Sequence, residues 1–274
     1  MRRRGVGGAV RQALMLLMTV TSLYPIYFII ITSLKTQSAY TLNLTGLPHD
    51  PTLYNLDQAL TAIPFPRWFG NTVLLTVSSV ILTIIVTALA AYALAWGRFP
   101  GRTFLLRLNI ALMVVPPVIL IIPIFVLVVQ IGLINTYLSV VIFYAGLLVP
   151  FSVYLLTTFF REVPHEMFES AQMDGARRFG ILWRIIIPLV VPALVTLVVV
   201  NVLWVWNELL IALVFLQNNE MRTIMAGLAM FQGRYATNQP LIMAGSLLAM
   251  LPTVLLYLFG QRYFVKGLTA GIGK

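Results

Sequence analysis

Cysteine is absent from the 274-residue sequence, and charged residues make up only 9% of it. The absence of cysteine excludes a disulfide framework, a thiolate metal site and a cysteine nucleophile. A soluble domain usually carries about 25% charged residues, whereas here 60% of the residues are hydrophobic and the mean hydropathy is +0.94. With so little polar material to face water, much of the surface must face lipid. The composition therefore excludes a soluble globule, a disordered chain and a secreted scaffold.

The sequence contains several long apolar runs. A helix that crosses a hydrocarbon core of about 30 Å needs about 20 mostly apolar residues. Six runs meet this requirement, and we predict an all-α integral membrane protein whose residues 1–274 form a single transmembrane domain. Pro116, Pro117 and Pro123 predict kinks in the third span. The six predicted spans are 12–33, 70–96, 105–129, 137–158, 187–212 and 241–261.

The basic residues predict the orientation, because Lys and Arg accumulate in cytoplasmic loops. If the N-terminus is cytoplasmic, fourteen of the 18 Lys and Arg residues fall on the cytoplasmic side, namely Arg2, Arg3, Arg4, Arg11, Arg98, Arg102, Arg107, Arg161, Arg177, Arg178, Arg184, Arg262, Lys266 and Lys274. We therefore predict a multi-pass protein of the cell inner membrane with both termini in the cytoplasm. The positive charges form no continuous stripe, so the net charge of +10 does not indicate nucleic-acid binding.

The remaining inventory excludes most enzymes. The only histidines, His49 and His165, are predicted on opposite sides of the membrane and cannot share a metal ion or a catalytic triad. The glycine-rich tail 267–274 lacks the spacing and the hydroxyl residue of a phosphate-binding loop. We therefore predict no catalytic residue and no metal site in this chain.

Glu208 is the clearest ionisable group within a predicted span. Asn201 and Glu208 are seven residues apart and share a helix face, with Trp204 between them. An indole beside an amide and a carboxylate can hold a sugar, so Asn201, Trp204, Asn207 and Glu208 are candidates for a substrate pathway. The same residues are also typical of an interfacial aromatic belt or of a paired carboxylate at a helix end.

The predicted cytoplasmic loop 160–187 carries the densest charge of the chain. Its apolar residues recur at helical spacing and form one stripe of Phe168, Ala171, Ala176, Phe179, Leu182 and Trp183. The stripe predicts one or two short amphipathic helices, with Gly175 either breaking the helix or allowing a close approach. A helix inserted into the groove of a soluble partner explains the stripe and the flanking charges. Packing on the chain's own spans is the alternative.

This loop resembles the Glu-Ala-Ala loop of ABC-importer permeases. The resemblance rests on Glu169-Ser170-Ala171, Asp174-Gly175-Ala176, Phe179, Ile187-Pro188-Leu189 and Pro192, with Ser170 where the family usually has alanine. Three further stretches resemble the second permease of a maltose-type pair in the carbohydrate-uptake family: Tyr24-Pro25 leading to Ser33-Leu34-Lys35, Trp206-Asn207-Glu208, and the tail 261–271. The resemblance covers essentially the whole chain.

The resemblance implies a permease subunit of an ATP-driven, binding-protein-dependent importer of a sugar or oligosaccharide that works by alternating access. Its loop would be a cytoplasmic coupling helix between spans four and five that contacts an ATPase through Glu169, Ser170, Ala171, Asp174, Gly175 and Ala176. Phe179 and Pro188 would tie the loop to the fifth span. Thr269 and Lys274 would contact the ATPase too, unless the tail is a frayed terminus.

The implied partners are a homologous second permease, two ATPase subunits and an external solute-binding protein. ATP and Mg would be bound by the ATPase, so this chain would bind no cofactor and would not be an enzyme. The outer segments 34–69 and 217–240 are where the binding protein would dock, and a short helix is expected around Leu53–Leu60.

Two other functions stay open. An importer of a non-sugar solute, such as a polyol or a glycerophosphate-type compound, would share the loop. A stand-alone secondary transporter would need several charges at mid-membrane and no partner for the loop.

Overall fold

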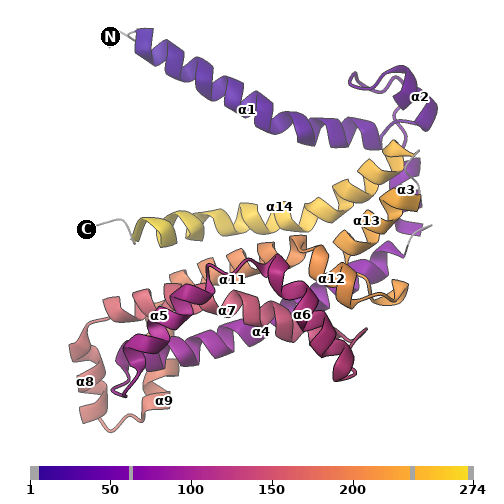
Figure 1. Cartoon of the computed structure of the whole chain (residues 1–274). Helices are drawn as coiled ribbons and strands as arrows, with labels where there is room; N and C mark the ends of the chain where they lie inside the picture. The colour runs from indigo at the N-terminus through magenta and orange to yellow at the C-terminus, as the bar shows by residue number, and fades with distance from the viewer. Residues whose placement is uncertain (1–5, 62–63, 235–237, 271–274) are drawn as a thin grey trace. The chain divides into compact units, whose positions relative to one another are not determined.

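The computed structural model describes residues 6–61, 64–234 and 238–270, and these form helices and connecting loops without a β-strand among them (Figure 1). The all-α prediction is confirmed for this part of the chain. The chain divides into two compact units, residues 1–66 with 227–251 and residues 67–226 with 252–274. The helices that matter below are α1 (Val6–Ser33), α2 (Gln37–Leu42), α3 (Tyr54–Thr61), α4 (Phe65–Trp96), α5 (Arg102–Leu112), α6 (Pro117–Gln130), α7 (Tyr137–Glu162), α8 (His165–Met173), α9 (Arg178–Ile181), a π-helical turn (Leu182–Ile186), α10 (Ile187–Leu189), α11 (Val191–Asn207), α12 (Leu210–Phe215), a 3₁₀ turn (Asn219–Met221), α13 (Ile224–Arg234) and α14 (Gln239–Ala270).

Four of these helices are long and apolar enough to cross a membrane, judged by length and composition. They are Val10–Ser33, Phe65–Trp96, Tyr137–Glu162 and Gln239–Gln261. Two bent pairs, α5 with α6 and the stretch Arg178–Leu189 with α11, raise the number to six if each pair is one broken span. The four continuous helices agree with four of the six predicted spans.

The third predicted span, 105–129, is broken instead of kinked. The axes of α5 and α6 meet at 100°, and the helix stops between Leu112 and Pro117. Proline has no N–H to donate and disfavours a helical conformation in the residue before it. Pro116 and Pro117 in tandem therefore end one helix and start the next, whereas Pro123 lies inside α6 without interrupting it.

The fifth predicted span, 187–212, is also discontinuous. An 80° bend separates α10 from α11, and α11 ends at Asn207 before α12 begins. Pro188 and Pro192 lack the N–H groups that would continue the helical ladder on either side of the bend. The breaks within this predicted span were not predicted, because hydropathy does not register a break in the backbone hydrogen bonds.

The segment after α1 forms a compact loop around Lys35. Lys35 is 1% exposed, and its ammonium donates hydrogen bonds to the carbonyl oxygens of Asn43 (2.6 Å) and Leu44 (3.2 Å). Burial lowers the pKa of the Lys35 ammonium. Asn55 on α3 donates to the carbonyls of Ser33 and Lys35 at 2.9 and 2.7 Å. The helix expected around Leu53–Leu60 is therefore present as α3, whereas α2 and α13 were not predicted.

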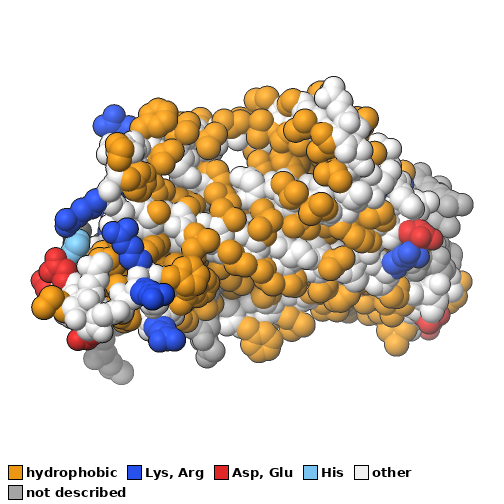
Figure 2. Space-filling model, turned by 90° about the horizontal axis from the view of Figure 1, so that it is seen from below, with side chains coloured by type: hydrophobic (Ala, Val, Ile, Leu, Met, Phe, Trp, Pro, Cys, Tyr) orange, Lys and Arg blue, Asp and Glu red, His pale blue; other side chains and the backbone are white. Residues whose placement is uncertain are grey.

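Packing within the second unit joins α4, α7 and α11. One buried cluster contains Ala88 and Ala91 of α4, Leu156 and Phe160 of α7, and Leu197 of α11. Many other large apolar side chains stay exposed, and in the face shown in Figure 2 hydrophobic side chains cover a broad middle region while charged ones gather toward its ends. This distribution suits a protein whose middle faces lipid or other apolar chains.

Candidate functional site

The loop 160–187 folds as two short helices, α8 and α9, that are separated at Gly175. Pro164 precedes α8, and proline tolerates this position because the first N–H groups of a helix have no partner within it. One side of α8 packs against the end of α4. The Phe168 ring is stacked 4.8 Å from Trp96, the His165 ring lies 4.9 Å from Trp96, and Ala171 is only 7% exposed.

The small residues of this loop form a helix C-cap of the Schellman type. Gly175 adopts a φ of +80°, a left-handed conformation that glycine reaches without steric cost. Its N–H donates to the carbonyl of Gln172 at 3.0 Å, and the N–H of Ala176 donates to the carbonyl of Ala171 at 2.9 Å. Ala171 and Ala176 belong to the same apolar cluster. Gly175 was predicted either to break the helix or to allow a close approach, and in the structure it ends α8.

The apolar stripe predicted for the loop is divided between two environments. Phe168, Ala171, Ala176 and Leu182 join the cluster of α4, α7 and α11. Phe179 is instead 64% exposed, with its ring 6.0 Å from the partly exposed Trp183. Among the described residues, Phe179 does not join the cluster that contains Leu197 of the fifth span, and its role in tying the loop to that span stays a prediction.

The polar residues proposed for ATPase contact lie on the outer side of α8. Glu169, Ser170 and Asp174 are exposed, as is Pro188 in α10. The Ser170 hydroxyl donates to the carbonyl of Glu166 at 2.6 Å, a bond within its own helix. Among the described residues, Glu169, Ser170 and Asp174 thus lie outside the apolar cluster that covers Ala171.

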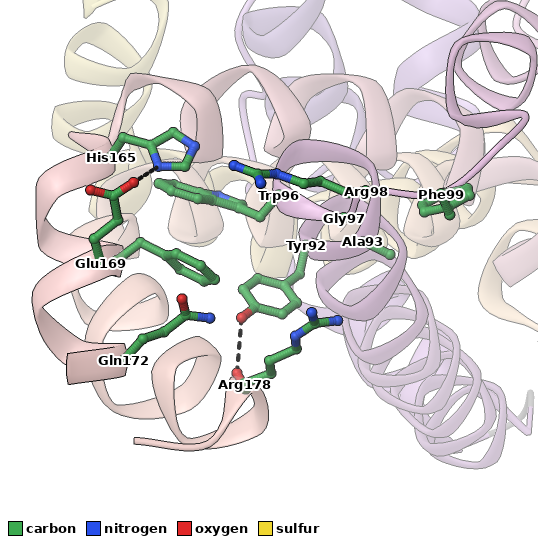
Figure 3. Close-up of a pocket in the computed structure, with 11 residues that line it drawn as sticks. Tyr92, Ala93, Trp96, Gly97, Arg98, Phe99, His165, Glu169, Gln172 and Arg178 are labelled. Carbon is green, nitrogen blue, oxygen red and sulfur yellow. Dashed lines mark hydrogen bonds and ion pairs between the residues drawn. The ribbon is translucent and has the colours of Figure 1, made fainter. Parts of the chain in front are cut away.

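Residues at the end of α4 complete this region, and sequence reasoning did not find them. A cavity of about 510 Å³ lies between the end of α4 and α8 (Figure 3). The Tyr92 hydroxyl donates to the carbonyl of Arg178 at 3.0 Å, which joins α4 to the start of α9. The sequence shows aromatic and basic residues at the end of an apolar run, namely Tyr92, Trp96, Gly97 and Arg98. Nothing in the sequence indicates that these residues lie against α8.

The second predicted site, at Glu208, lies at the break between α11 and α12. The Glu208 carboxylate accepts hydrogen bonds from the backbone N–H groups of Ile211 (2.9 Å) and Ala212 (3.1 Å). It also accepts one from the hydroxyl of Tyr144 on α7 at 2.7 Å. Glu208 thereby satisfies the start of α12 and ties it to α7, the arrangement of a paired carboxylate at a helix end.

The other three pathway candidates are divided between two sides of α11. Asn201 is fully buried and donates to the Ser152 hydroxyl of α7 at 3.1 Å, and the Trp204 ring packs edge-on against Tyr144. Asn207 is exposed and donates to the carbonyl of Leu203 at 2.7 Å. An open groove of about 660 Å³ is lined by Val200, Leu203, Trp204, Asn207, Glu208, Leu209 and Leu210. The structure thus brings Trp204, Asn207 and Glu208 to one groove and Asn201 to the core.

A further polar cluster holds the 217–223 loop against the start of α4. The Asn71 amide nitrogen donates to the carbonyls of Glu220 (2.8 Å) and Arg222 (2.9 Å), and its oxygen accepts from the Tyr137 hydroxyl at 2.8 Å. Arg67 and Glu220 form an exposed ion pair at 2.9 Å. Both N–H groups of the Asn71 amide are engaged, so two carbonyl groups of the loop are anchored to α4.

The predicted tail contacts lie at the end of the chain. Thr269 falls within α14, and Lys274 lies outside the described residues. Among the residues that the structure describes, no group of three or more His, Asp or Glu side chains is placed to hold a metal ion.

The chain is similar to known proteins of membrane transport. A family model described as "Binding-protein-dependent transport system inner membrane component" matches residues 84–270. The chain is 33% identical to the sulfoquinovosyl glycerol transport system permease protein SmoH of Agrobacterium fabrum, over 93% of this chain and 90% of that protein. It is 32% identical to the arabinooligosaccharides transport system permease protein AraQ of Halalkalibacterium halodurans, over 91% and 90%. Its fold is similar to a chain of a bacterial ABC transporter involved in the import of the acidic polysaccharide alginate, with a TM-score of 0.85, 26% identity and coverage of 96% and 98%.

Proposed function

Because the chain belongs to the family of binding-protein-dependent transport system inner membrane components, we propose that it is the permease subunit of an ATP-driven importer of sugars or oligosaccharides. The observation that carries this proposal is the similarity to carbohydrate permeases over more than nine-tenths of the chain. The similar fold of an alginate importer chain supports the same substrate class.

The membrane topology that fits this function has six spans, with each bent pair forming one broken span and both termini in the cytoplasm. The four long apolar helices and the two bent pairs supply the six crossings. The excess of Lys and Arg in alternate loops supports the orientation. In this topology α8 faces the cytoplasm and the 217–223 loop faces the outside.

The role proposed for α8 is to receive the movement of an ATPase and pass it to the spans. Its exposed side, with Glu169, Ser170 and Asp174, would enter a cleft on the ATPase. Its other side is joined to α4 through the Trp96 and Phe168 stack, and Leu182 and Ile186 beyond it are buried against the same cluster. A rigid helix packed in this way transmits displacement instead of absorbing it. ATP and Mg would be held by two ATPase subunits.

The complete importer would also contain a homologous second permease and an external binding protein. The names of the relatives give sulfoquinovosyl glycerol, arabinooligosaccharides and the acidic polysaccharide alginate, which supports the carbohydrate class without selecting one sugar. Glu208, Asn207 and Trp204 border the groove on α11 and remain the candidates for contact with the solute.

The proposal is tested by purifying the tagged chain from its native membrane in a mild detergent and identifying the co-purifying proteins by mass spectrometry. We expect a second permease and an ATPase, and we expect the complex in proteoliposomes to import a carbohydrate only when ATP and the binding protein are present. A polyol and a glycerophosphate serve as competing solutes. Recovery of the chain alone after cross-linking, or import without ATP, would favour a secondary transporter.

Loosening the 217–223 loop is expected to weaken docking of the binding protein. Asn71→Ala removes both donor bonds to the loop and leaves the carbonyls of Glu220 and Arg222 without this partner. Two lost hydrogen bonds are together worth about 2 kcal/mol, so we expect the affinity of the complex for the binding protein to fall by up to about thirtyfold. The measurement is surface plasmon resonance on the complex in nanodiscs. Asn218→Ala, which removes a bond within the loop to the Glu220 N–H, is the control and should change the affinity less.

A further inference from the structure

The cavity between α4 and α8 combines an aromatic wall with unpaired positive charge. Its wall includes Tyr92, Trp96 and Phe168, and Figure 3 shows the Arg98 side chain extending along Trp96 toward His165 while Arg178 lies on the side of Tyr92. Of the residues that line the cavity, only Glu169 is also proposed to contact an ATPase, and the aromatic and guanidinium groups have no part in that contact. They call for a separate explanation.

The charges of the lining are not balanced within the chain. Two guanidinium groups, of Arg98 and Arg178, line the cavity together with one carboxylate, that of Glu169. The Glu169 carboxylate lies 3.7 Å from the Nδ1 atom of His165. In the described part of the chain neither guanidinium forms an ion pair with a carboxylate. The cavity therefore carries an excess of positive charge.

The start of α8 adds a further source of positive potential at this cavity, because His165 and Phe168 of that helix line it. The nine-residue helix α8 begins at His165 without a side-chain cap, so its positive N-terminal end is open. The carbonyls at the end of α4 would repel an anion, but the Arg102 guanidinium occupies those of Leu94, Ala95 and Gly97 at 2.7, 3.0 and 3.3 Å.

We propose that this cavity binds a phosphate ester, with its phosphate between Arg98 and the start of α8 and its organic part against Trp96. Guanidinium groups match the oxygen geometry of phosphate, and helix N-termini favour the same anion. The aromatic faces suit the C–H groups of a small polyol or sugar. The same chemistry is found in a soluble phosphate ester and in the headgroup of an anionic phospholipid, and the experiment separates these two sources.

The test measures binding to the intact importer complex. Calorimetry with sn-glycerol 3-phosphate examines the soluble source. Native mass spectrometry of complexes released from nanodiscs of phosphatidylcholine, with and without phosphatidylglycerol, examines the lipid source. We expect one site per chain for one of the two probes, and Arg98→Gln should weaken it about tenfold because a charge-assisted bond is lost. Trp96→Phe keeps an aromatic face in the wall of the cavity and should weaken binding less.

Arg177→Gln is the matched control, since Arg177 is exposed on the same loop and does not line the cavity. The site is refuted if neither probe binds, or if Arg177→Gln weakens binding as much as Arg98→Gln. The proposed function is tested apart from the site. A complex that imports sugar but binds neither probe refutes the site alone. If no ATPase co-purifies with the chain and the chain still binds a probe, the importer is refuted and the site is not.

Discussion

Replacing Gly175 with valine is expected to reduce carbohydrate import by about tenfold or more while the complex still assembles and hydrolyses ATP. Gly175 has a φ of +80°, and a β-branched residue in the left-handed region costs about 1–3 kcal/mol. A Cβ at this position meets no atom within 4 Å, so the cost comes from the backbone and not from a clash. Relief of the strain would break the C-cap bonds of α8 and change its angle to α4.

The measurement compares ATP hydrolysis and import in proteoliposomes. Gly175→Asn is the matched control, because asparagine tolerates the left-handed conformation, and it should keep most of the import activity. Gly180→Val, on the same loop at a glycine without a positive φ, controls for the added side chain. Import by Gly175→Val at the wild-type rate would remove the argument that a rigid α8 transmits movement.

Replacing Glu208 with alanine is expected to cause the second large effect, a loss of both stability and import. The substitution leaves the N–H groups of Ile211 and Ala212 and the hydroxyl of Tyr144 without their acceptor. A buried polar group that is left unsatisfied costs about 1–3 kcal/mol. We expect α12 to unwind at its start and the unfolding temperature of the purified complex to fall by several degrees.

Two further variants separate the capping role of Glu208 from a role in the solute pathway. Tyr144→Phe removes one of the three partners and should lower the unfolding temperature by a smaller amount. Glu220→Ala, which removes an exposed ion pair with Arg67, is the control and should have little effect on stability. If Glu208→Gln changes the preference among sugars at an unchanged unfolding temperature, Glu208 contacts the solute and its cap is secondary.

Local patterns account for the parts of the molecule that were predicted. The four continuous long helices follow from apolar runs that are longer than a membrane is thick. The hydrogen bonds that end α8 join residues between Ala171 and Ala176, which are close in the sequence. The local spacing of these residues was therefore enough to predict a helix that Gly175 could interrupt. Prolines predicted a kink in the third run but not a 100° bend, and the breaks in the fifth run were not predicted, because hydropathy is the same for an apolar residue in a helix and in a bend.

Contacts between distant residues account for the parts that were not predicted. Asn71 binds the backbone of Glu220, 149 positions away, and Tyr144 binds Glu208 across 64 positions. The aromatic wall of the cavity pairs Trp96 with Phe168, and Phe179, which has the same apolar character as Phe168, is left exposed. No periodicity in a single segment specifies such pairs.

The amino-acid sequence was sufficient to identify a helical membrane permease and to predict a partner-binding role for the loop 160–187, because apolar length, charge asymmetry and a short motif are local properties. The tertiary structure was needed to show which side of α8 is covered, which groups donate hydrogen bonds to Glu208, and that Arg98 and Arg178 form no ion pair within the described part of the chain. Those outcomes depend on the geometry with which α4, α7 and α11 pack, and that geometry decides which polar groups find a partner within the chain.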